Sequence, residues 1–359
     1  MELPYVTDPK LGIGGKLRAI PEHFVVEEIP LYLPLDEGTH LYLNISKVGL
    51  TTRYLIDQVE RLLKLRRGDV GYAGLKDKHA RTTQTISIPL ERPTPEAIDA
   101  IVAQIKAEIP VEVNWARLHR NKLKTGHLIG NHFQITISGL EQSPAESLAS
   151  AQTIAATIQR RGIANYFGEQ RFGHEGDNAE QGRALLLGER YLRDPWMRRF
   201  LISSYQSELC NRYLTLRLNN GLFDKILIGD VAKKHATGGI FTVSDASVDQ
   251  ERFDNREISF TAPLFGYKMN NATDESAILE ASVLQEAGLT MDHWRRAKVE
   301  GTRRMGRLLI DDLQLAMNDA GLTLSFSLPK GAFATTVLRE FMKNESAEEQ
   351  IGEEESDFE

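Results

Sequence analysis

One cysteine, Cys210, is present in a chain of 359 residues, and this scarcity excludes several classes of site. A single thiol cannot form an internal disulfide, and it cannot supply the thiolate sets of structural zinc sites and redox pairs. The nine histidines are scattered, without a His-Glu-x-x-His pattern or a calcium-loop pattern. We therefore expect no protein-bound metal, and we interpret Cys210 as a small buried hydrophobe on a helix.

Long apolar runs are missing as well. No run approaches the roughly 18–20 apolar residues of a membrane helix, and the first residues lack the basic and apolar regions of an export signal. Hydrophobic residues at 41% and charged residues at 26% are typical of a soluble globular protein. We expect a cytoplasmic protein without membrane contact, and its length favours two domains over one.

The acidic charge is concentrated at the C-terminus. The formal net charge is −7, but residues 344–359 hold eight acids and no base, and the rest of the chain has 42 acids against 43 Lys and Arg. We expect this acidic tail to be disordered. It is interpreted either as a solubilising end or as an acidic strip that competes with RNA for a basic groove.

Three basic stretches, residues 61–81, 115–132 and 295–307, favour a polyanionic partner. Each stretch taken alone is typical of a solvated charged face. Tyr72, Trp115 and Phe133 lie among or next to them, and aromatic side chains interleaved with bases are what a protein needs to stack bases and hold phosphates.

The hydrophobic pattern predicts both strands and helices. The pattern predicts strands or extended segments at residues 24–30, 41–46, 69–74, 82–89, 111–118, 131–138 and 322–328. Helical spacing predicts helices at residues 54–65, 95–109, 145–161, 196–218, 276–286, 291–299 and 335–343. Strands and helices do not alternate strictly in the N-terminal part, so the pattern favours an α+β fold over a doubly wound one.

One loop carries a dense set of polar side chains between two extended segments. Residues 71–84 read Gly-Tyr-Ala-Gly-Leu-Lys-Asp-Lys-His-Ala-Arg-Thr-Thr-Gln. Asp77 stands between Lys76 and Lys78, and neighbouring cations favour an ionised carboxylate, which suits a nucleophile or a general base. An exposed charged turn is the alternative interpretation. Walker and Gly-x-Gly-x-x-Gly patterns are missing, which argues against nucleotide hydrolysis and dinucleotide binding.

Five blocks of the sequence occur in an order found in a known family. They are residues 21–28, 74–84, 130–133, 165–173 and 328–335, and the second contains Gly-Leu-Lys-Asp-Lys-His-Ala. Together they resemble the TruD family of tRNA pseudouridine synthases. The resemblance implies an α+β fold with a mixed, mainly antiparallel sheet, flanking helices and an inserted second α/β domain. It places the catalytic domain at residues 1–161 and 309–343 and the insertion at residues 162–308.

The resemblance also implies a reaction, the isomerisation of a uridine in tRNA, at position 13 of the D-arm. The N-glycosidic bond is broken, the uracil turns, and a C–C glycosidic bond forms through C5. No cofactor is expected, because a positioned carboxylate in an enclosed pocket is sufficient. Asp77 is the implied catalytic residue, either by covalent attack or by proton abstraction that opens a glycal path. We expect the enzyme to be a monomer.

The target uridine must leave its stack, so the resemblance implies a pocket that receives it. Phe133 is expected to stack on the base, and Asn131 is expected to bind the base or the catalytic loop. Phe24 is expected to form a second wall. Each of the three residues also fits an ordinary position in a strand, as a core aromatic or as a turn asparagine.

Basic residues are expected to support the catalytic loop and to bind RNA. Arg18 stands where family relatives often carry lysine, and it could grip the carboxylate with two hydrogen bonds. Lys76 and Lys78 are expected to neutralise Asp77 or to bind phosphate. Arg171 could instead pair with an acid inside the insertion. The candidate RNA contacts are His79, Arg81, Arg120, Lys122, Lys124 and Arg171.

Two other functions fit parts of the sequence. A noncatalytic RNA-binding protein or chaperone could keep the fold without the chemistry, but the intact triplet at residues 76–78 argues against it. A phosphoester hydrolase with a lone carboxylate would need metal ligands, and the sequence offers no set of them.

Overall fold

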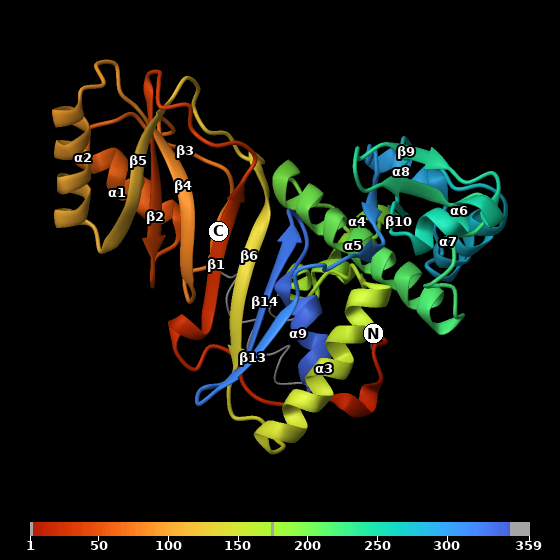
Figure 1. Ribbon diagram of the computed structural model, residues 1–359. Helices are drawn as coiled ribbons and strands as arrows, with labels where there is room; N and C mark the ends of the chain where they lie inside the picture. Colours follow the sequence, from red (N-terminus) through yellow and green to blue (C-terminus); the bar gives the residue numbers. More distant parts are fainter. Residues whose placement is uncertain (1–2, 174–175, 345–359) are drawn as a thin grey trace. The chain divides into compact units, whose positions relative to one another are not determined.

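The computed structural model of the chain describes residues 3–173 and 176–344. It divides into two compact units (Figure 1). The sheet unit comprises Ile13–Ala149 and Asp311–Ala334, and the helical unit comprises Met1–Gly12, Ser150–Ile310 and Thr335–Glu359. The domain boundaries expected after residues 161 and 308 stay a prediction. The acidic tail lies, from residue 345 onward, outside the described residues.

The sheet unit is built on one large sheet. Its strands are β1 (Phe24–Pro30), β2 (His40–Lys47), β3 (Gly71–Tyr72), β4 (Arg81–Pro89), β5 (Val111–His119), β6 (Leu128–Ile137), β13 (Gln314–Asn318) and β14 (Gly321–Pro329). Among the described residues the order is β13-β14-β6-β1-β4-β2-β5, with β3 paired to β4. Of the strand pairs between described residues of this sheet, β1 with β4 is parallel and the others are antiparallel. The predicted α+β class with a mainly antiparallel sheet is confirmed.

Two amphipathic helices, α1 (Thr52–Leu62) and α2 (Pro95–Glu108), belong to the sheet unit and lie at its β2–β5 end (Figure 1). The Thr51 hydroxyl accepts a hydrogen bond from the amide of Tyr54 and starts α1. Leu55 and Val59 then recur at helical spacing and pack, fully buried, against the apolar residues of β2 and β4. This packing fixes the start of α1 relative to the ends of both strands, where the candidate site lies.

The helical unit has smaller sheets. Helix α3 (Pro144–Arg161) leads into it from the sheet unit. The following elements are β7 (Ile163–Ala164), α4 (Asn178–Leu187), α5 (Pro195–Asn219), β8 (Val231–Lys234), β9 (Ile240–Thr242), α6 (Ala246–Asp254), β10 (Ile258–Leu264), α7 (Asp274–Glu286), α8 (Met291–Ala297), β11 (Thr302–Met305), β12 (Arg307–Leu308) and α9 (Ala334–Met342). In the described part of the chain, β11-β10-β8-β9 form one sheet, and β12 pairs with β7.

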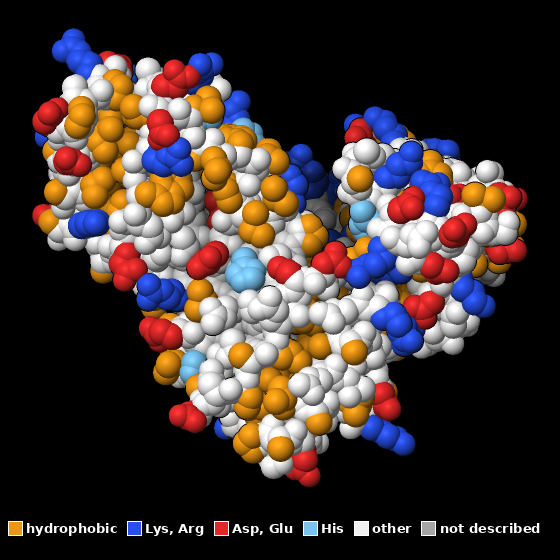
Figure 2. All heavy atoms as spheres, in the orientation of Figure 1, with side chains coloured by type: hydrophobic (Ala, Val, Ile, Leu, Met, Phe, Trp, Pro, Cys, Tyr) orange, Lys and Arg blue, Asp and Glu red, His pale blue; other side chains and the backbone are white. Residues whose placement is uncertain are grey.

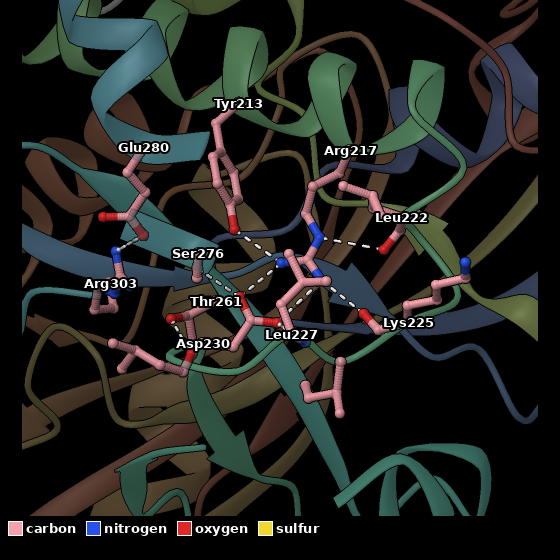
Figure 3. A network of polar contacts seen from close by, with 12 residues as sticks. Tyr213, Arg217, Leu222, Lys225, Leu227, Asp230, Thr261, Ser276, Glu280 and Arg303 are labelled. Atoms are coloured by element: carbon pink, nitrogen blue, oxygen red, sulfur yellow. Dashed lines mark hydrogen bonds and ion pairs between the residues drawn. The ribbon is translucent and has the colours of Figure 1, made fainter. Parts of the chain in front are cut away.

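A buried polar network stabilises the helical unit (Figure 3). Arg217 on α5 donates to both carboxylate oxygens of Asp230, at 2.7 and 3.0 Å, and both side chains are almost fully buried. Ser276 on α7 also donates to Asp230, and Arg217 donates to the hydroxyl of Tyr213. The pair therefore ties α5, α7 and the segment before β8 together. No helix among the described residues is long and apolar enough to cross a bilayer.

Candidate active site

Residues 73–80 join β3 to β4, and we name this segment the Asp77 loop. It is held by the connection that runs from the end of β2 to the start of α1. Three successive residues of the loop each bond to that connection, at 2.9, 3.0 and 2.9 Å. The bonds join the Lys76 amide to the Thr52 hydroxyl, the Asp77 carbonyl to the Lys47 ammonium, and the Lys78 carbonyl to the Gly49 amide. The loop backbone is thereby fixed on both sides of the Asp77 side chain.

The Asp77 carboxylate lies beside Arg18. One guanidinium nitrogen of Arg18 is 3.8 Å from a carboxylate oxygen, and the side chains are 9% and 38% exposed. The guanidinium also lies over the ring of Phe24, with its central carbon 4.2 Å from the ring centroid. Burial lowers the pKa of Arg18 below its ordinary value, and the Asp77 charge partly opposes this shift. The structure thus brings three predicted site residues together.

Lys76 points away from solvent and meets an acid that the sequence did not mark as part of the site. Its ammonium lies 2.8 Å from a carboxylate oxygen of Glu28 on β1, and the two side chains are 4% and 2% exposed. The other Glu28 oxygen accepts from the backbone amide of Thr85 on β4. Lys78 and His79, in contrast, are exposed.

The three residues expected to form the uridine pocket share one face of the sheet. Phe133 lies directly opposite Val26 of β1, Asn131 opposite Glu28, and Phe24 opposite Ile135. Residues directly opposite in an antiparallel pair point to the same side, so the Lys76–Glu28 pair links the Asp77 loop to this face.

On this face the aromatic rings are packed, whereas a buried polar atom lacks a hydrogen-bond partner among the described residues. The amide oxygen of Asn131 is buried, and no described residue donates a hydrogen bond to it. The ring of Phe133 is buried and stacks on Phe326 of β14, with centroids 5.5 Å apart. Phe24 is buried as well.

The predicted RNA contacts of the sheet unit lie at its surface, and several are engaged by neighbouring groups. Arg81 pairs with Glu112 at 2.9 Å, Arg120 pairs with Glu37, and Lys122 donates to the carbonyl of Gly68. Lys124 is exposed. Over the sheet unit, Figure 2 shows basic and acidic side chains interspersed, which is consistent with these ion pairs.

Arg171 belongs to the helical unit and contacts α5. Its guanidinium donates to the hydroxyls of Ser203 and Ser207 and lies over the ring of Phe200. These contacts join Arg171 to three residues of α5. Within residues 3–173 and 176–344, no three His, Cys, Asp or Glu side chains are grouped so that they could hold a metal ion.

Sequence reasoning missed two charged residues that hold the Asp77 loop, Glu28 and Lys47. Lys47 could have been found from the alternation of β2. Leu41, Leu43 and Ile45 define one buried face of the strand, and position 47 is the next position on that face. Glu28 likewise falls in register with Phe24 on β1. A charge on the buried side of a strand indicates a specific partner.

The chain is similar to one family of known proteins over nearly its whole length. The family model for tRNA pseudouridine synthase D (TruD) matches residues 2–193 and 189–341. The chain is 43% identical to tRNA pseudouridine synthase D of Anaeromyxobacter sp., with 95% of this chain and 96% of the relative covered, and 41% identical to that of Thermus thermophilus, with 96% and 93% covered.

A solved structure is similar over nearly its whole length. The crystal structure of a candidate tRNA pseudouridine synthase D from Methanosarcina mazei superposes with a TM-score of 0.79 at 25% identity, covering 97% of this chain and all of the other. The family match covers far more than half of the described residues, including the Asp77 loop and the face with Asn131 and Phe133. The chain therefore belongs to the tRNA pseudouridine synthase D family of RNA-modifying isomerases.

Proposed function

We propose that this protein converts uridine 13 in the D-arm of tRNA to pseudouridine, with Asp77 as its catalytic residue. One observation carries the assignment of Asp77: its half-exposed carboxylate projects from a loop whose backbone is bonded on three successive residues, and a buried guanidinium lies 3.8 Å away. A fixed carboxylate with an adjacent cation is what the reaction needs at the sugar of an extruded nucleoside.

The reaction is balanced without any co-reactant. The bond between N1 of uracil and C1′ of the ribose breaks, the ring turns, and the bond between C5 and C1′ forms. C5 loses a proton and N1 gains one, so the product is an isomer of the substrate. Asp77 acts either by forming a bond to the sugar or by removing a proton from it, and Arg18 supplies the counter-charge beside it.

The face that carries Phe24, Asn131 and Phe133 supplies groups for the flipped uridine. The Asn131 amide oxygen is buried without a donor among the described residues, and uracil offers the N3–H as a matching donor. Phe133 is supported from behind by Phe326 and gives the pocket an aromatic wall. Base-aromatic stacking contributes about 1–3 kcal/mol.

The test uses purified protein and two tRNA transcripts that differ only in carrying uridine or cytidine at position 13. Pseudouridine is mapped by mass spectrometry after incubation with the wild type, with Asp77→Asn, and with Asp57→Asn as a control on an exposed aspartate of α1. We expect pseudouridine at position 13 with the wild type and the control, and none with Asp77→Asn. Binding of tRNA by Asp77→Asn should stay within about threefold of the wild type, because the change preserves shape and removes one charge.

Two outcomes would contradict the proposal in different ways. Turnover by Asp77→Asn would remove the assignment of the catalytic residue. Pseudouridine formed equally well in the cytidine-13 transcript would leave the activity but remove the target position.

A further inference from the structure

A second charged side chain of the sheet unit touches the Asp77 loop from its buried side. Lys47, the last residue of β2, is only 2% exposed. Its ammonium donates to the carbonyl oxygens of Leu50 at 2.5 Å and of Asp77 at 3.0 Å. Lysine is almost never buried to this degree without a partner, because an ammonium loses its hydration there.

The local fold does not require a lysine at this position. Helix α1 already has its cap in Thr51, and the turn between β2 and α1 is made by Gly49, whose φ of 72° suits glycine. An apolar residue at position 47 would continue the buried alternation of Leu43 and Ile45. Besides the local bond to the Leu50 carbonyl, the ammonium adds a bond across 30 positions of sequence to the backbone of Asp77 itself.

The charges around Lys47 show that it belongs to the same electrostatic site. Burial lowers the pKa of Lys47 to about 8, the Asp77 carboxylate opposes this shift, and Lys76 adds to it. Lys76 is neutralised by Glu28 at 2.8 Å. Two further cations lie beside Asp77, Arg18 from the segment before β1 and Lys47 from the end of β2. One faces its carboxylate and the other its carbonyl.

We propose that Lys47 is the positioning residue of the Asp77 loop, and that its ammonium fixes the direction of the Asp77 carboxylate by binding the carbonyl of the same residue. This inference rests on the proposed function of Asp77. Lys47 does not touch substrate; it acts through the loop. A displacement of about 1 Å at a reacting group can lower a rate by about a hundredfold, so loss of this bond is expected to act on the chemical step.

The experiment compares the wild type with Lys47→Met, which keeps most of the apolar stem and removes the ammonium, and with Lys106→Met as a control on an exposed lysine of α2. Thermal melting first establishes which variants are folded at the assay temperature. Single-turnover rates at saturating tRNA, tRNA affinity, and hydrogen exchange of the amides at residues 74–80 are then measured. We expect Lys47→Met to react about a hundredfold more slowly, to bind tRNA within about threefold of the wild type, and to exchange the loop amides faster. Lys106→Met should behave as the wild type.

The result that overturns the inference is a folded Lys47→Met that reacts within about threefold of the wild type, or one in which loop exchange is unchanged. If Lys47→Met does not fold, Lys47→Gln is used with the same criteria, because its side chain is one atom too short to span to the Asp77 carbonyl. Loop exchange is measured without turnover. A wild type that modifies no tRNA, or an Asp77→Asn variant that is active, would refute the proposed function. The hydrogen exchange of the loop amides would still show whether Lys47 fixes the loop.

Discussion

The Lys76–Glu28 pair allows a quantitative test of how the Asp77 loop is attached to the sheet. The two side chains are 4% and 2% exposed and 2.8 Å apart, so neither charge has access to bulk water. Replacing Lys76 by Met leaves the Glu28 carboxylate buried without its cation. Removal of one partner from a buried pair costs about 3–5 kcal/mol, whereas replacement of both by apolar residues is often neutral.

We therefore expect Lys76→Met to lower the unfolding free energy of the sheet unit by about 3–5 kcal/mol. The double variant Lys76→Met/Glu28→Leu should recover most of this loss. About 1 kcal/mol should stay lost, because the amide of Thr85 gives up its bond to Glu28.

Native-state hydrogen exchange of the amides of β1 and β6 is the suitable assay, because it reports on the sheet unit separately from the helical unit. The expected change for Lys76→Met is exchange faster by about a hundredfold to a few thousandfold. Arg81→Met is the matched control. It breaks the Arg81–Glu112 pair of similar length whose side chains are 40% and 66% exposed, and such pairs contribute about 0–1 kcal/mol. Equal exchange in the Lys76 and Arg81 variants, or no recovery in the double variant, would refute the reasoning.

Three further predictions concern other buried groups. Arg217→Met should destabilise the helical unit by about 3–5 kcal/mol, measured by exchange of the α5 amides, because it leaves the Asp230 charge buried; unchanged exchange would contradict this. Burial raises the pKa of Cys210 to about 12, so iodoacetamide at pH 8 should label it only after denaturation, and rapid labelling of native protein would be the opposing result. The pKa of Lys47 is about 8 in the folded chain against an ordinary 10.5, so the unfolded state binds the proton more tightly. The unfolding free energy of the wild type relative to Lys47→Met should therefore rise between pH 8 and 10.5, by at most about 3 kcal/mol, and a flat difference in urea titrations would exclude the shift.

Much of the fold of the sheet unit followed from the sequence because apolar residues recur at alternate positions of several strands, as Leu41, Leu43 and Ile45 do in β2. The strand at residues 24–30 was predicted with the bounds that β1 has, and β2 and β14 are each longer than predicted by one residue at both ends. The resemblance implied an α/β insertion, but the hydrophobic pattern predicted none of the strands of the sheet in the helical unit. Its central strand β10 is buried at six of seven positions, so it has no alternation to detect, and β8 and β9 are only four and three residues long.

The candidate site was predictable only in part. The Asp77 loop is a continuous segment, and its composition alone marked it as unusual. Its supports come from other parts of the chain: Lys47 lies 30 positions before Asp77, and Glu28 lies 48 positions before Lys76. Alternation shows that both residues face the core side of their strands. Which charges meet there is decided by the pairing of the strands, and this pairing cannot be read from a single sequence.

The triplet Lys76-Asp77-Lys78 shows why residue type alone is insufficient. In the sequence the two lysines are equivalent neighbours of one aspartate. The backbone bends at Lys78, so this residue does not repeat the direction of Lys76, and the three residues lie at different depths. Lys76 points inward to Glu28, Asp77 is half-exposed beside Arg18, and Lys78 is exposed. The inward lysine stabilises the loop and the outward lysine is free to meet a phosphate, so substitution of Lys76 should act mainly on stability and substitution of Lys78 mainly on tRNA affinity and its salt dependence.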